Sequence, residues 1–280
     1  MQVFSKISDL KEKLRFHSSL HKTIGFVPTM GALHEGHISL LKQAKTQTDI
    51  AVVSIFVNPT QFNNKADLEK YPRTVEEDLQ KLESQNCDYV FLPEEKEMYP
   101  EEDKRIFDFG MLDKVMEGKH RKGHFNGVAQ IVSKLFEIVE PDKAFFGEKD
   151  FQQLAIVKNM VSLLNLKTEI IGCPIVREKN GLAMSSRNML LTETLRNEAA
   201  IIFKTLTKAV EMAKNHSPEQ VTDWAIENIN NTKILNVEYF EIVDSLTLQK
   251  IDNWNQCNKI TGCIAVFADK VRLIDNISMK

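Results

Sequence analysis

Short apolar runs alternate with longer amphipathic segments from Thr23 onwards. The apolar runs are TIGFVPT, IAVVSIFVN, YVFLP, KAFFG and EIIGCPIV, and the segments between them include GHISLLKQAKTQT, VEEDLQKLESQN, GVAQIVSKLFEIVEP and KDFQQLAIVKNMVSLLN. This alternation is typical of βαβ units and a parallel sheet. Because the runs are apolar throughout, we expect helices on both faces of that sheet. The pattern therefore predicts an α/β fold with a Rossmann-like doubly wound parallel sheet.

The N-terminal stretch has the spacing of an amphipathic helix. Phe4, Ile7, Leu10 and Leu14 recur at intervals of three and four residues, which places them on one helical face. The pattern predicts an ordinary first helix that includes Phe4.

The pattern changes after the SSRN stretch. Two helices are predicted, at 193–214 and 218–231, and they are followed by strands in NVEYFEIVD and CIAVFADKVRLID. The second of these reads as a hairpin that turns near 268–270. We expect a smaller C-terminal α+β domain here.

Length and composition agree with two folded domains. At roughly 150 residues per domain, 280 residues suffice for a Rossmann-like domain at 1–174 and a C-terminal domain at 175–280. Hydrophobic residues make up 42% and charged residues 27% of the chain, which predicts a packed core and not a disordered chain.

Charge and cysteine content argue against several classes of partner. The net charge of -3 argues against nucleic acid, whose partners carry strongly basic faces. No apolar run reaches the about 18 residues of a membrane span, and the charged N-terminus lacks the apolar block of a signal peptide. The four cysteines contain no C-x-x-C pair, which argues against a zinc site or a disulfide framework. We expect a cytoplasmic protein with reduced cysteines.

The stretch PTMGALHEGH joins the first predicted strand to a helix. In a doubly wound sheet, ligands bind at the carboxyl ends of the strands, where helix N-termini offer N–H groups and a positive dipole end. Gly31 and Gly36 allow close approach of the backbone, and His34 and His37 fall on the same side of the first helical turn. The stretch predicts a phosphate site, with exposed loop histidines beside a helix cap as the alternative. A metal site lacks a third cluster of ligands.

Two further stretches follow predicted strands and carry phosphate-binding groups. In GLAMSSRN, Ser185, Ser186 and Arg187 are able to donate to phosphate oxygens, although an N-cap beside a surface arginine is the alternative. In FFGEKDFQQL, Lys149 suits a phosphate as a point charge, and Asp150 suits a helix cap or a ligand contact.

Amide and basic side chains form two more candidate groups. Asn58 and Gln61 end the second strand in SIFVNPTQF and suit hydroxyl or carboxylate recognition. The stretch MEGKHRKGHFNG concentrates basic side chains, including Arg121. Alone, it is typical of a solvated basic loop.

Together these stretches resemble the pantoate–β-alanine ligase family, also called pantothenate synthetases. The segments FVPTMGALHEGH, SIFVNPTQF, YPRT, GHFNGVAQIVSKLFEIVEPDKAFFGEKDFQQL and GLAMSSRN match the family in order and spacing from residue 26 to 188. The first segment also resembles the HIGH motif, and MSSR the KMSKS motif, of the nucleotidyltransferase superfamily that includes class I aminoacyl-tRNA synthetases.

The resemblance implies an ATP-dependent ligase. In this family (R)-pantoate attacks the α-phosphate of ATP to give pantoyl adenylate and pyrophosphate, and β-alanine then displaces AMP to give pantothenate. Mg2+ accompanies the ATP and is held mainly by its phosphates, with Asp150 as a candidate protein ligand. The family also implies a homodimer and a C-terminal domain that closes over ATP, which fits an intermediate that water would hydrolyse.

The resemblance implies an ATP site made of three stretches and one further residue. These are Met30, Gly31, Ala32, Leu33, His34, Glu35, Gly36 and His37; Gly147, Glu148, Lys149 and Asp150; Val176; and Met184, Ser185, Ser186 and Arg187. His34, His37, Lys149 and Arg187 are the implied catalytic residues at the phosphates. His37 serves such enzymes as a general acid, but we favour stabilisation of charge by a protonated His37, because pyrophosphate leaves readily without a proton.

The resemblance also implies a pantoate site. Gln61 and Gln153 hold the substrate, Asn58 supports them, and Tyr71 and Arg121 fall at family positions. At Lys122 the sequence departs from the proline that is common in the family, and this frees φ in the loop.

Two other functions stay open at this point. One is a different nucleotidyltransferase of the same superfamily, whose product would keep the nucleotidyl group. The other is a non-catalytic nucleotide- or RNA-binding module descended from a synthetase.

Overall fold

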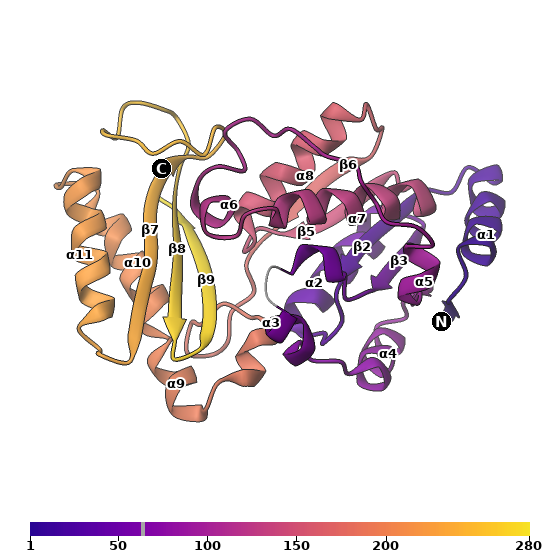
Figure 1. Ribbon diagram of the computed structural model, residues 1–280, viewed down its shortest axis with the longest axis horizontal. Coiled ribbons are helices and arrows are strands. Elements are labelled where there is room, and N and C mark those ends of the chain that lie inside the picture. Colours follow the sequence, from indigo (N-terminus) through magenta and orange to yellow (C-terminus); the bar gives the residue numbers. More distant parts are fainter. Residues whose placement is uncertain (63–64) are drawn as a thin grey trace. The chain divides into compact units, whose positions relative to one another are not determined.

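The computed structural model describes residues 1–62 and 65–280, with the backbone alone for 65–67. The chain divides into two compact units, and each is built around its own sheet (Figure 1). Unit 1 comprises Met1–Phe109, Arg121–Glu148 and Ile156–Pro174. Unit 2 comprises Gly110–His120, Lys149–Ala155 and Ile175–Lys280.

Unit 1 contains a parallel sheet whose described strands have the order β1-β4-β3-β2-β5-β6. They are β1 (Gln2–Phe4), β2 (Ile24–Thr29), β3 (Ile50–Ile55), β4 (Tyr89–Phe91), β5 (Lys143–Gly147) and β6 (Glu169–Cys173). The chain runs outward from β2 to β3 and β4, and it later returns to the other side of β2 with β5. Doubly wound sheets bind ligands at such a reversal. The predicted fold class is confirmed.

Helices cover both faces of this sheet. Alternate residues of β2 point to opposite faces: Val27 packs in a cluster with Leu41 and Leu82, whereas the Phe26 ring lies 6.2 Å from the ring of Phe136. The helices of unit 1 are α1 (Ile7–Ser19), α2 (Glu35–Gln47), η1 (Pro59–Gln61), α3 (Lys65–Lys70), α4 (Val75–Ser84), α5 (Glu95–Met98), α7 (His124–Val139) and α8 (Phe151–Leu163), the last of which begins within unit 2.

The predicted first helix is wrong at its start. Phe4 belongs to strand β1 and is 7% exposed, and the helix begins only at Ile7. The backbone N–H of Gln2 donates to the carbonyl of Asp88 at 3.0 Å, next to β4. These residues therefore form a strand by pairing with the edge of β4, although their spacing also fits a helix.

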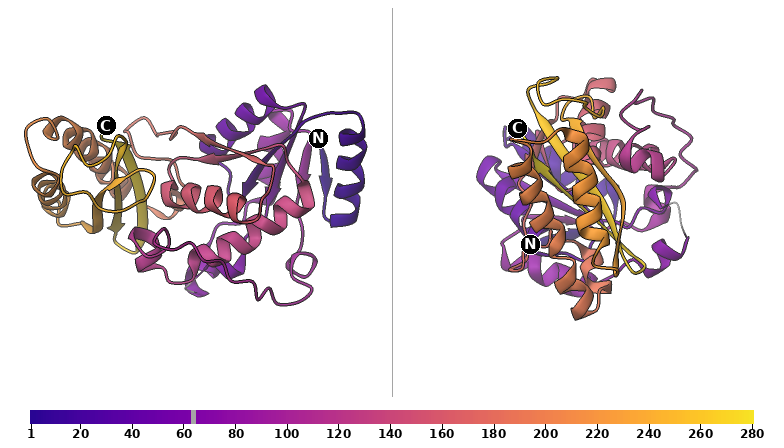
Figure 2. Two further views of the ribbon diagram at one scale, coloured as in Figure 1. Left: turned by 90° about the horizontal axis from the view of Figure 1, so that it is seen from above. Right: turned by 90° about the vertical axis from the view of Figure 1, so that its left-hand side faces the viewer.

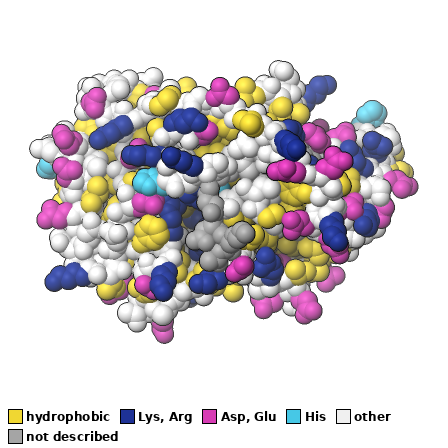
Figure 3. Space-filling model, viewed as in Figure 1, with side chains coloured by type: hydrophobic (Ala, Val, Ile, Leu, Met, Phe, Trp, Pro, Cys, Tyr) yellow, Lys and Arg dark blue, Asp and Glu magenta, His cyan; other side chains and the backbone are white. Residues whose placement is uncertain are grey.

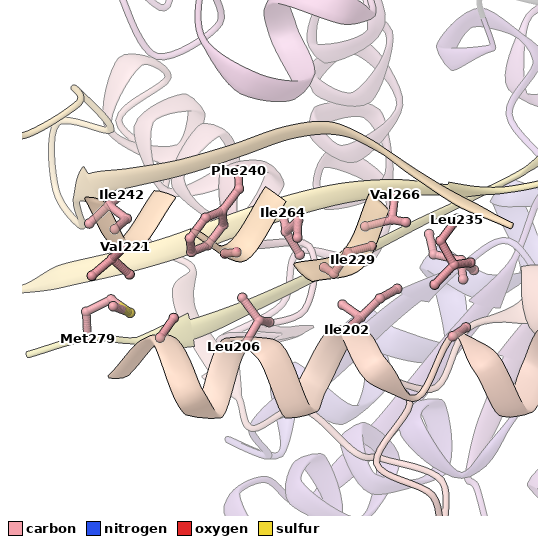
Figure 4. Packing of buried hydrophobic residues seen from close by; sticks show 14 of the residues in the cluster. Ile202, Leu206, Val221, Ile229, Leu235, Phe240, Ile242, Ile264, Val266 and Met279 are labelled. Atoms are coloured by element: carbon pink, nitrogen blue, oxygen red, sulfur yellow. The ribbon is translucent and has the colours of Figure 1, made fainter. Parts of the chain in front are cut away.

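Unit 2 contains an antiparallel sheet of β7 (Leu235–Asp244), β8 (Ile260–Ala268) and β9 (Val271–Ser278). Helices α10 (Ile201–Met212) and α11 (Pro218–Asn230) lie along one face of it (Figures 1 and 2). Side chains from both helices and all three strands interlock there, among them Ile202, Leu206, Val221, Phe240, Ile264 and Met279 (Figure 4). The predicted hairpin is confirmed, since β8 ends at Ala268 and β9 starts at Val271.

The helix predicted at 193–214 is two helices, α9 (Glu193–Glu198) and α10. Between them the N–H of Ala200 donates to Asn197, and the N–H of Ile202 donates to Ala199, three residues back instead of four. Both alanines are buried. Since neither glycine nor proline marks the break, the apolar spacing did not reveal it. Unit 2 also contains α6 (Met116–His120) and η2 (Ser186–Leu190).

Basic and acidic side chains are mixed over the face shown in Figure 3. Among the helices of the described residues, none is long and apolar enough to cross a membrane.

Candidate active site

The loop after β2 leads directly into α2 and joins His34 to His37. His34 is the N-cap of α2, and its Nδ1 accepts the N–H of Gly36 at 3.1 Å. The backbone N–H of His34 donates to Nδ1 of His37 at 3.3 Å, and the two ring centroids lie 4.1 Å apart. The two imidazoles are thus held as a pair at a helix N-terminus, as the sequence predicts.

These contacts assign the ring protons of the pair. A nitrogen that accepts a hydrogen bond carries a lone pair, so the proton of each neutral ring lies on Nε2. A second proton would have to be placed on the accepting Nδ1. In the neutral form of each ring, this geometry leaves Nε2–H as the donor.

A buried carboxylate outside the predicted site fixes the same loop. Asp78 of α4 accepts the N–H groups of Ala32 at 2.8 Å and Leu33 at 2.7 Å, and the Thr74 hydroxyl donates to it at 3.2 Å. Its side chain is fully buried. Gly31 (φ 80°) and Ala32 (φ 49°) adopt the left-handed conformation that this turn requires.

Asp78 limits how the loop can meet a ligand. The amides of Ala32 and Leu33 are already used, and the Leu33 side chain is 3% exposed and packs in the core. Half-buried or exposed side chains in this stretch belong to Met30, His34, Glu35 and His37. Sequence reasoning missed Asp78, although its spacing from Leu82 places an acid on the buried face of α4.

The loop after β3 holds Gln61 through Asn58. Asn58 is 1% exposed, and its Nδ2 donates to Gln61 Oε1 at 3.3 Å and to the Gly127 carbonyl at 3.2 Å. Its Oδ1 accepts the Tyr99 hydroxyl at 2.8 Å. Both polar ends of Asn58 therefore have protein partners, which fits a supporting role.

The remaining contacts of Gln61 come from neighbouring loops. Its Nε2 donates to the sulfur of Met30 at 2.8 Å, which is a weak acceptor. The backbone carbonyl oxygen of Gln61 lies 2.8 Å from Nδ1 of His124. The loop is thereby tied both to the stretch after β2 and to the start of α7.

Two secondary candidates lie at the edges of this region. Tyr71 is 7% exposed, with its ring 5.7 Å from that of Phe62. Arg121 is half-buried, and its carbonyl accepts the N–H of His124 at 3.0 Å. Lys122, at the position where the family commonly has proline, is exposed.

Strand β5, which pairs with β2, ends at Gly147 and is followed by Glu148. The backbone N–H of Glu148 donates to the Cys173 carbonyl at 2.8 Å. A Cβ on Gly147 would meet no described atom within 4 Å, so this backbone is open to a ligand. Burial raises the pKa of the nearby Cys173 thiol to about 11, which excludes a thiolate nucleophile there at neutral pH.

Lys149, Asp150 and Gln153 belong to unit 2 and start α8. The Asp150 carbonyl accepts the Leu154 N–H at 2.9 Å, so Asp150 occupies the N-cap position. Gln152 is 4% exposed and bonds to the backbone of Leu112, Val115 and Glu117. Gln153, by contrast, is half-buried. Of the two adjacent glutamines, Gln152 is thus the structural one.

The stretch from Val176 to Arg187 forms a bent hairpin in unit 2. The Val176 carbonyl accepts the Met184 N–H at 2.9 Å, and the Ser185 hydroxyl accepts the Arg187 N–H at 3.3 Å as the N-cap of η2. Ser186 is 7% exposed, whereas Met184, Ser185 and Arg187 are half-buried. Ser185 therefore caps η2. A helix cap was the alternative to a phosphate site for this serine-rich stretch.

The described side chains do not form a complete metal-binding site by themselves. Throughout 1–62 and 65–280, apart from the side chains at 65–67, no group of three or more His, Cys, Asp or Glu residues could hold an ion. Asp150 is a half-buried carboxylate that suits Mg2+, which commonly binds one or two carboxylates together with substrate phosphates.

Known proteins resemble this chain over its full length. The family profile described as Pantoate-beta-alanine ligase matches residues 2–278. The chain is 54% identical over 277 residues to the pantothenate synthetase of Porphyromonas gingivalis, with 99% of each chain covered. It is 52% identical over 280 residues to that of Bacteroides fragilis, with 100% of this chain and 99% of the relative covered.

Solved structures resemble it as well. The pantothenate synthetase from Thermus thermophilus has a TM-score of 0.94 and 37% identity, with 100% of this chain and 99% of that chain covered. The pantoate-beta-alanine ligase from Francisella tularensis, complexed with beta-gamma ATP and β-alanine, has a TM-score of 0.83 and 38% identity, with 100% and 98% covered.

Proposed function

The chain belongs to the pantoate–β-alanine ligase family, and we propose that it joins its substrates through a pantoyl adenylate. It is an enzyme, and its activity is the ATP-dependent ligation of pantoate to β-alanine. The observation that supports the adenylate route best is the pair of capping histidines at the carboxyl end of β2. This position is where a doubly wound sheet and a helix N-terminus together favour a phosphate.

In the first step the pantoate carboxylate attacks the α-phosphorus of ATP. A carboxylate–phosphorus bond forms, and the bond from the α-phosphorus to the bridging oxygen breaks to release pyrophosphate. Negative charge grows on the transferring and leaving oxygens. The Nε2–H groups of His34 and His37 donate to this charge, which lowers the barrier without a proton transfer.

In the second step the amine of β-alanine attacks the carbonyl carbon of the adenylate. A carbon–nitrogen bond forms, AMP leaves with the electrons of the carbon–oxygen bond, and the amine releases a proton to water. Gln61 and Gln153 hold the hydroxyl and carboxyl groups of pantoate. Asn58 positions Gln61, and Tyr71 and Arg121 contribute at the edge of the pantoate site.

The remaining family positions bind the nucleotide. Lys149 and Arg187 act at the phosphates, and the other contacts come from Gly147, Glu148, Asp150, Val176, Met184, Ser185 and Ser186, together with 30–37. Asp150 is the carboxylate that would help to hold Mg2+ alongside ATP, and the ion would supply positive charge that neutralises the phosphates.

Location and assembly are part of the same proposal. The four cysteines are free in the structure, which suits a reducing cytoplasm. A homodimer is the assembly implied by the family. Light scattering on the purified protein tests it, because a monomer at micromolar concentration would contradict the dimer.

Product analysis tests the function. With pantoate, β-alanine, ATP and Mg2+, we expect pantothenate, AMP and pyrophosphate in equal amounts, and no pantothenate when any substrate is omitted. A product that retains the adenylyl group would indicate a different nucleotidyltransferase. ATP binding without turnover would indicate a non-catalytic module.

A further inference from the structure

Strand β9 carries two adjacent buried polar residues. Asp275 is 5% exposed and Asn276 is 7% exposed. Consecutive residues of a strand point to opposite faces of the sheet. Asp275 shares its face with Leu273 and Ile277, which pack in the cluster of α10 and α11. One dipeptide therefore places a polar group on each face of the sheet in unit 2.

On the α10 face, Asp275 pairs with Arg177. Arg177 Nη1 lies 2.6 Å from Oδ2 and Nη2 lies 3.0 Å from Oδ1, a two-point contact that fixes the orientation of both groups. The guanidinium also donates to the Gly181 carbonyl at 3.2 Å and lies 3.7 Å from the ring centroid of Phe203. The ion pair is mostly buried, with side-chain exposures of 18% and 4%.

Arg177 is part of the hairpin that leads into the MSSR stretch. It bridges to Ala183, the residue before Met184. Asn188, just after the stretch, donates to the Ala183 carbonyl at 3.1 Å and to Glu178 Oε1 at 2.7 Å. The residues on both sides of 184–187 are thus hydrogen-bonded to, or part of, the hairpin segment that contains Arg177, the partner of Asp275.

On the opposite face, Asn276 holds the backbone of Lys149. Its Nδ2 donates to the Lys149 carbonyl at 2.9 Å. Cys263, which pairs with Asn276 across the sheet, belongs to the cluster where Phe151 and Ala155 of α8 pack. The start of α8 is therefore docked on this face, and Asn276 fixes the residue that precedes Asp150.

The charges agree with this arrangement. Burial raises the pKa of the Asp275 carboxyl, and Arg177 and, more weakly, Lys149 act in the opposite direction.

We propose that Asp275 and Asn276 are positioning residues for the phosphates of ATP. Asp275 acts through Arg177 on the 184–187 stretch, and Asn276 acts through the carbonyl of Lys149. Two phosphate-binding stretches that are distant in sequence then share one support on β9. The inference rests on the proposed function, in which Lys149 and 184–187 contact ATP.

As a consequence, ATP binding and adenylate formation should depend on Asp275 and Asn276 of β9. Rates are sensitive to small displacements of groups that align charge. Loss of either anchor lets one stretch shift relative to the other, so the cations no longer meet the phosphates together. Recognition of β-alanine does not depend on these contacts.

Three variants test the proposal. D275N removes the charge but keeps an oxygen acceptor and the shape, and N276A removes one side-chain hydrogen bond. E238Q on β7 is the matched control, because Glu238 pairs with Arg272 at 2.9 Å in the same unit and bonds to neither stretch. The measurements are the KM values for ATP and β-alanine and the rate of pantoate-driven ATP–pyrophosphate exchange.

We expect D275N to raise the KM for ATP and slow the exchange by roughly tenfold or more, as for the loss of a charge-assisted hydrogen bond. N276A has a smaller effect in the same direction. The KM for β-alanine stays within about twofold in both variants, and E238Q resembles the wild type in both KM values.

A double-mutant cycle separates positioning from general destabilisation. If Asn276 acts through Lys149, N276A slows exchange in the wild type but adds little in a K149A background. A merely structural role would slow exchange by the same factor in both backgrounds. Circular dichroism confirms folding, and if D275N does not fold, N276A and its cycle decide.

The outcomes distinguish the two proposals. Absence of exchange in the wild type contradicts the proposed function. Exchange in the wild type, with an unchanged KM for ATP in folded D275N and N276A, or equal factors in the cycle, overturns the positioning role alone.

Discussion

His34 and His37 are bonded to one another at the start of α2, since the backbone N–H of His34 donates to the Nδ1 of His37. The same turn uses Nδ1 of His34 as an acceptor for Gly36. Because both rings use Nδ1 in the cap, the neutral form of each ring carries its proton on Nε2, and the bonds that begin the helix also set the direction of these donors.

Donation of a hydrogen bond by His37 predicts different results for two substitutions. H37A should slow formation of pantoyl adenylate by roughly 10- to 100-fold, which corresponds to about 1.5–3 kcal/mol for a hydrogen bond to a charged group. H37Q keeps an N–H near the position of Nε2 and should retain most of the rate. Single-turnover measurement of pantoyl adenylate formation compares them.

The control is H21N, because His21 is exposed and has a positive φ of 57° that asparagine tolerates. It should behave as the wild type. Equal losses in H37Q and H37A would contradict donation by a neutral Nε2–H of His37.

Asp78 should control both stability and ATP use. D78A leaves two buried N–H groups without their acceptor, which should cost about 2–6 kcal/mol of unfolding free energy at 1–3 kcal/mol per group. D78N keeps one acceptor oxygen and should fall between D78A and the wild type. Urea unfolding and the KM for ATP measure the two effects.

Glu76 provides the comparison, since it is an exposed acid on the same helix. E76Q should change neither quantity. If D78A keeps the stability and the KM for ATP of the wild type, the loop after β2 does not depend on this carboxylate.

Gly147 and Gly127 should respond in opposite ways to alanine. A Cβ at Gly147 meets no described atom within 4 Å and its φ is not positive, so G147A should fold as well as the wild type. If ATP approaches this backbone, the KM for ATP should rise roughly tenfold, the effect of losing about 1.4 kcal/mol. Steady-state kinetics and urea unfolding test this, and an unchanged KM would remove Gly147 from the ATP site.

At Gly127 the added Cβ would overlap the Thr60 carbonyl. G127A should therefore lose about 1–3 kcal/mol of stability, as expected for overpacking. It should also raise the KM for pantoate, because Asn58 bonds to the Gly127 carbonyl and to Gln61. A G127A protein with wild-type stability would show that α7 and η1 separate at little cost.

His17 should make the protein less stable in mild acid. Burial, followed by the charges of Lys22 and Lys13, lowers the pKa of His17, whose Nε2 lies 2.6 Å from the Tyr89 hydroxyl. The unfolded chain then binds more protons than the folded one below the ordinary value of about 6.5, so the unfolding free energy falls as the pH drops towards the folded pKa.

Urea unfolding between pH 7.5 and pH 5 detects this effect. H17Q keeps a donor near Tyr89 and should show a flatter curve, whereas the exposed control H216Q should keep the slope of the wild type. Parallel curves for H17Q and the wild type would mean that His17 binds protons equally in both states.

The sequence pattern predicted helices and strands correctly where a single hydrophobic periodicity dominated a segment. The apolar strands and amphipathic helices from residue 23 to 173 follow it closely, because burial on both faces leaves a strong signature. The pattern was ambiguous at Phe4, where the spacing fits a helix but the residue forms a strand that pairs with β4. The pattern gave no sign of the helix break at Ala199 and Ala200, because alanine is compatible with a helix and with a break.

The sequence singles out candidate site residues mainly where they follow predicted strands. His34 and Lys149 are examples, because they come shortly after β2 and β5. Asp78 and Asp275 act from inside a helix and a strand, and what they bind depends on distant backbone that spacing does not encode. Their signature was an acid at an apolar position of the pattern, at Asp78 on the helical face of Leu82 and at Asp275 between Leu273 and Ile277.

The most direct measurement is the exchange of labelled pyrophosphate into ATP by the wild-type enzyme without β-alanine. The account predicts exchange that requires pantoate and Mg2+, because adenylate formation is reversible on the enzyme. Exchange that is absent with pantoate, while pantothenate still forms when β-alanine is added, would contradict the pantoyl adenylate route.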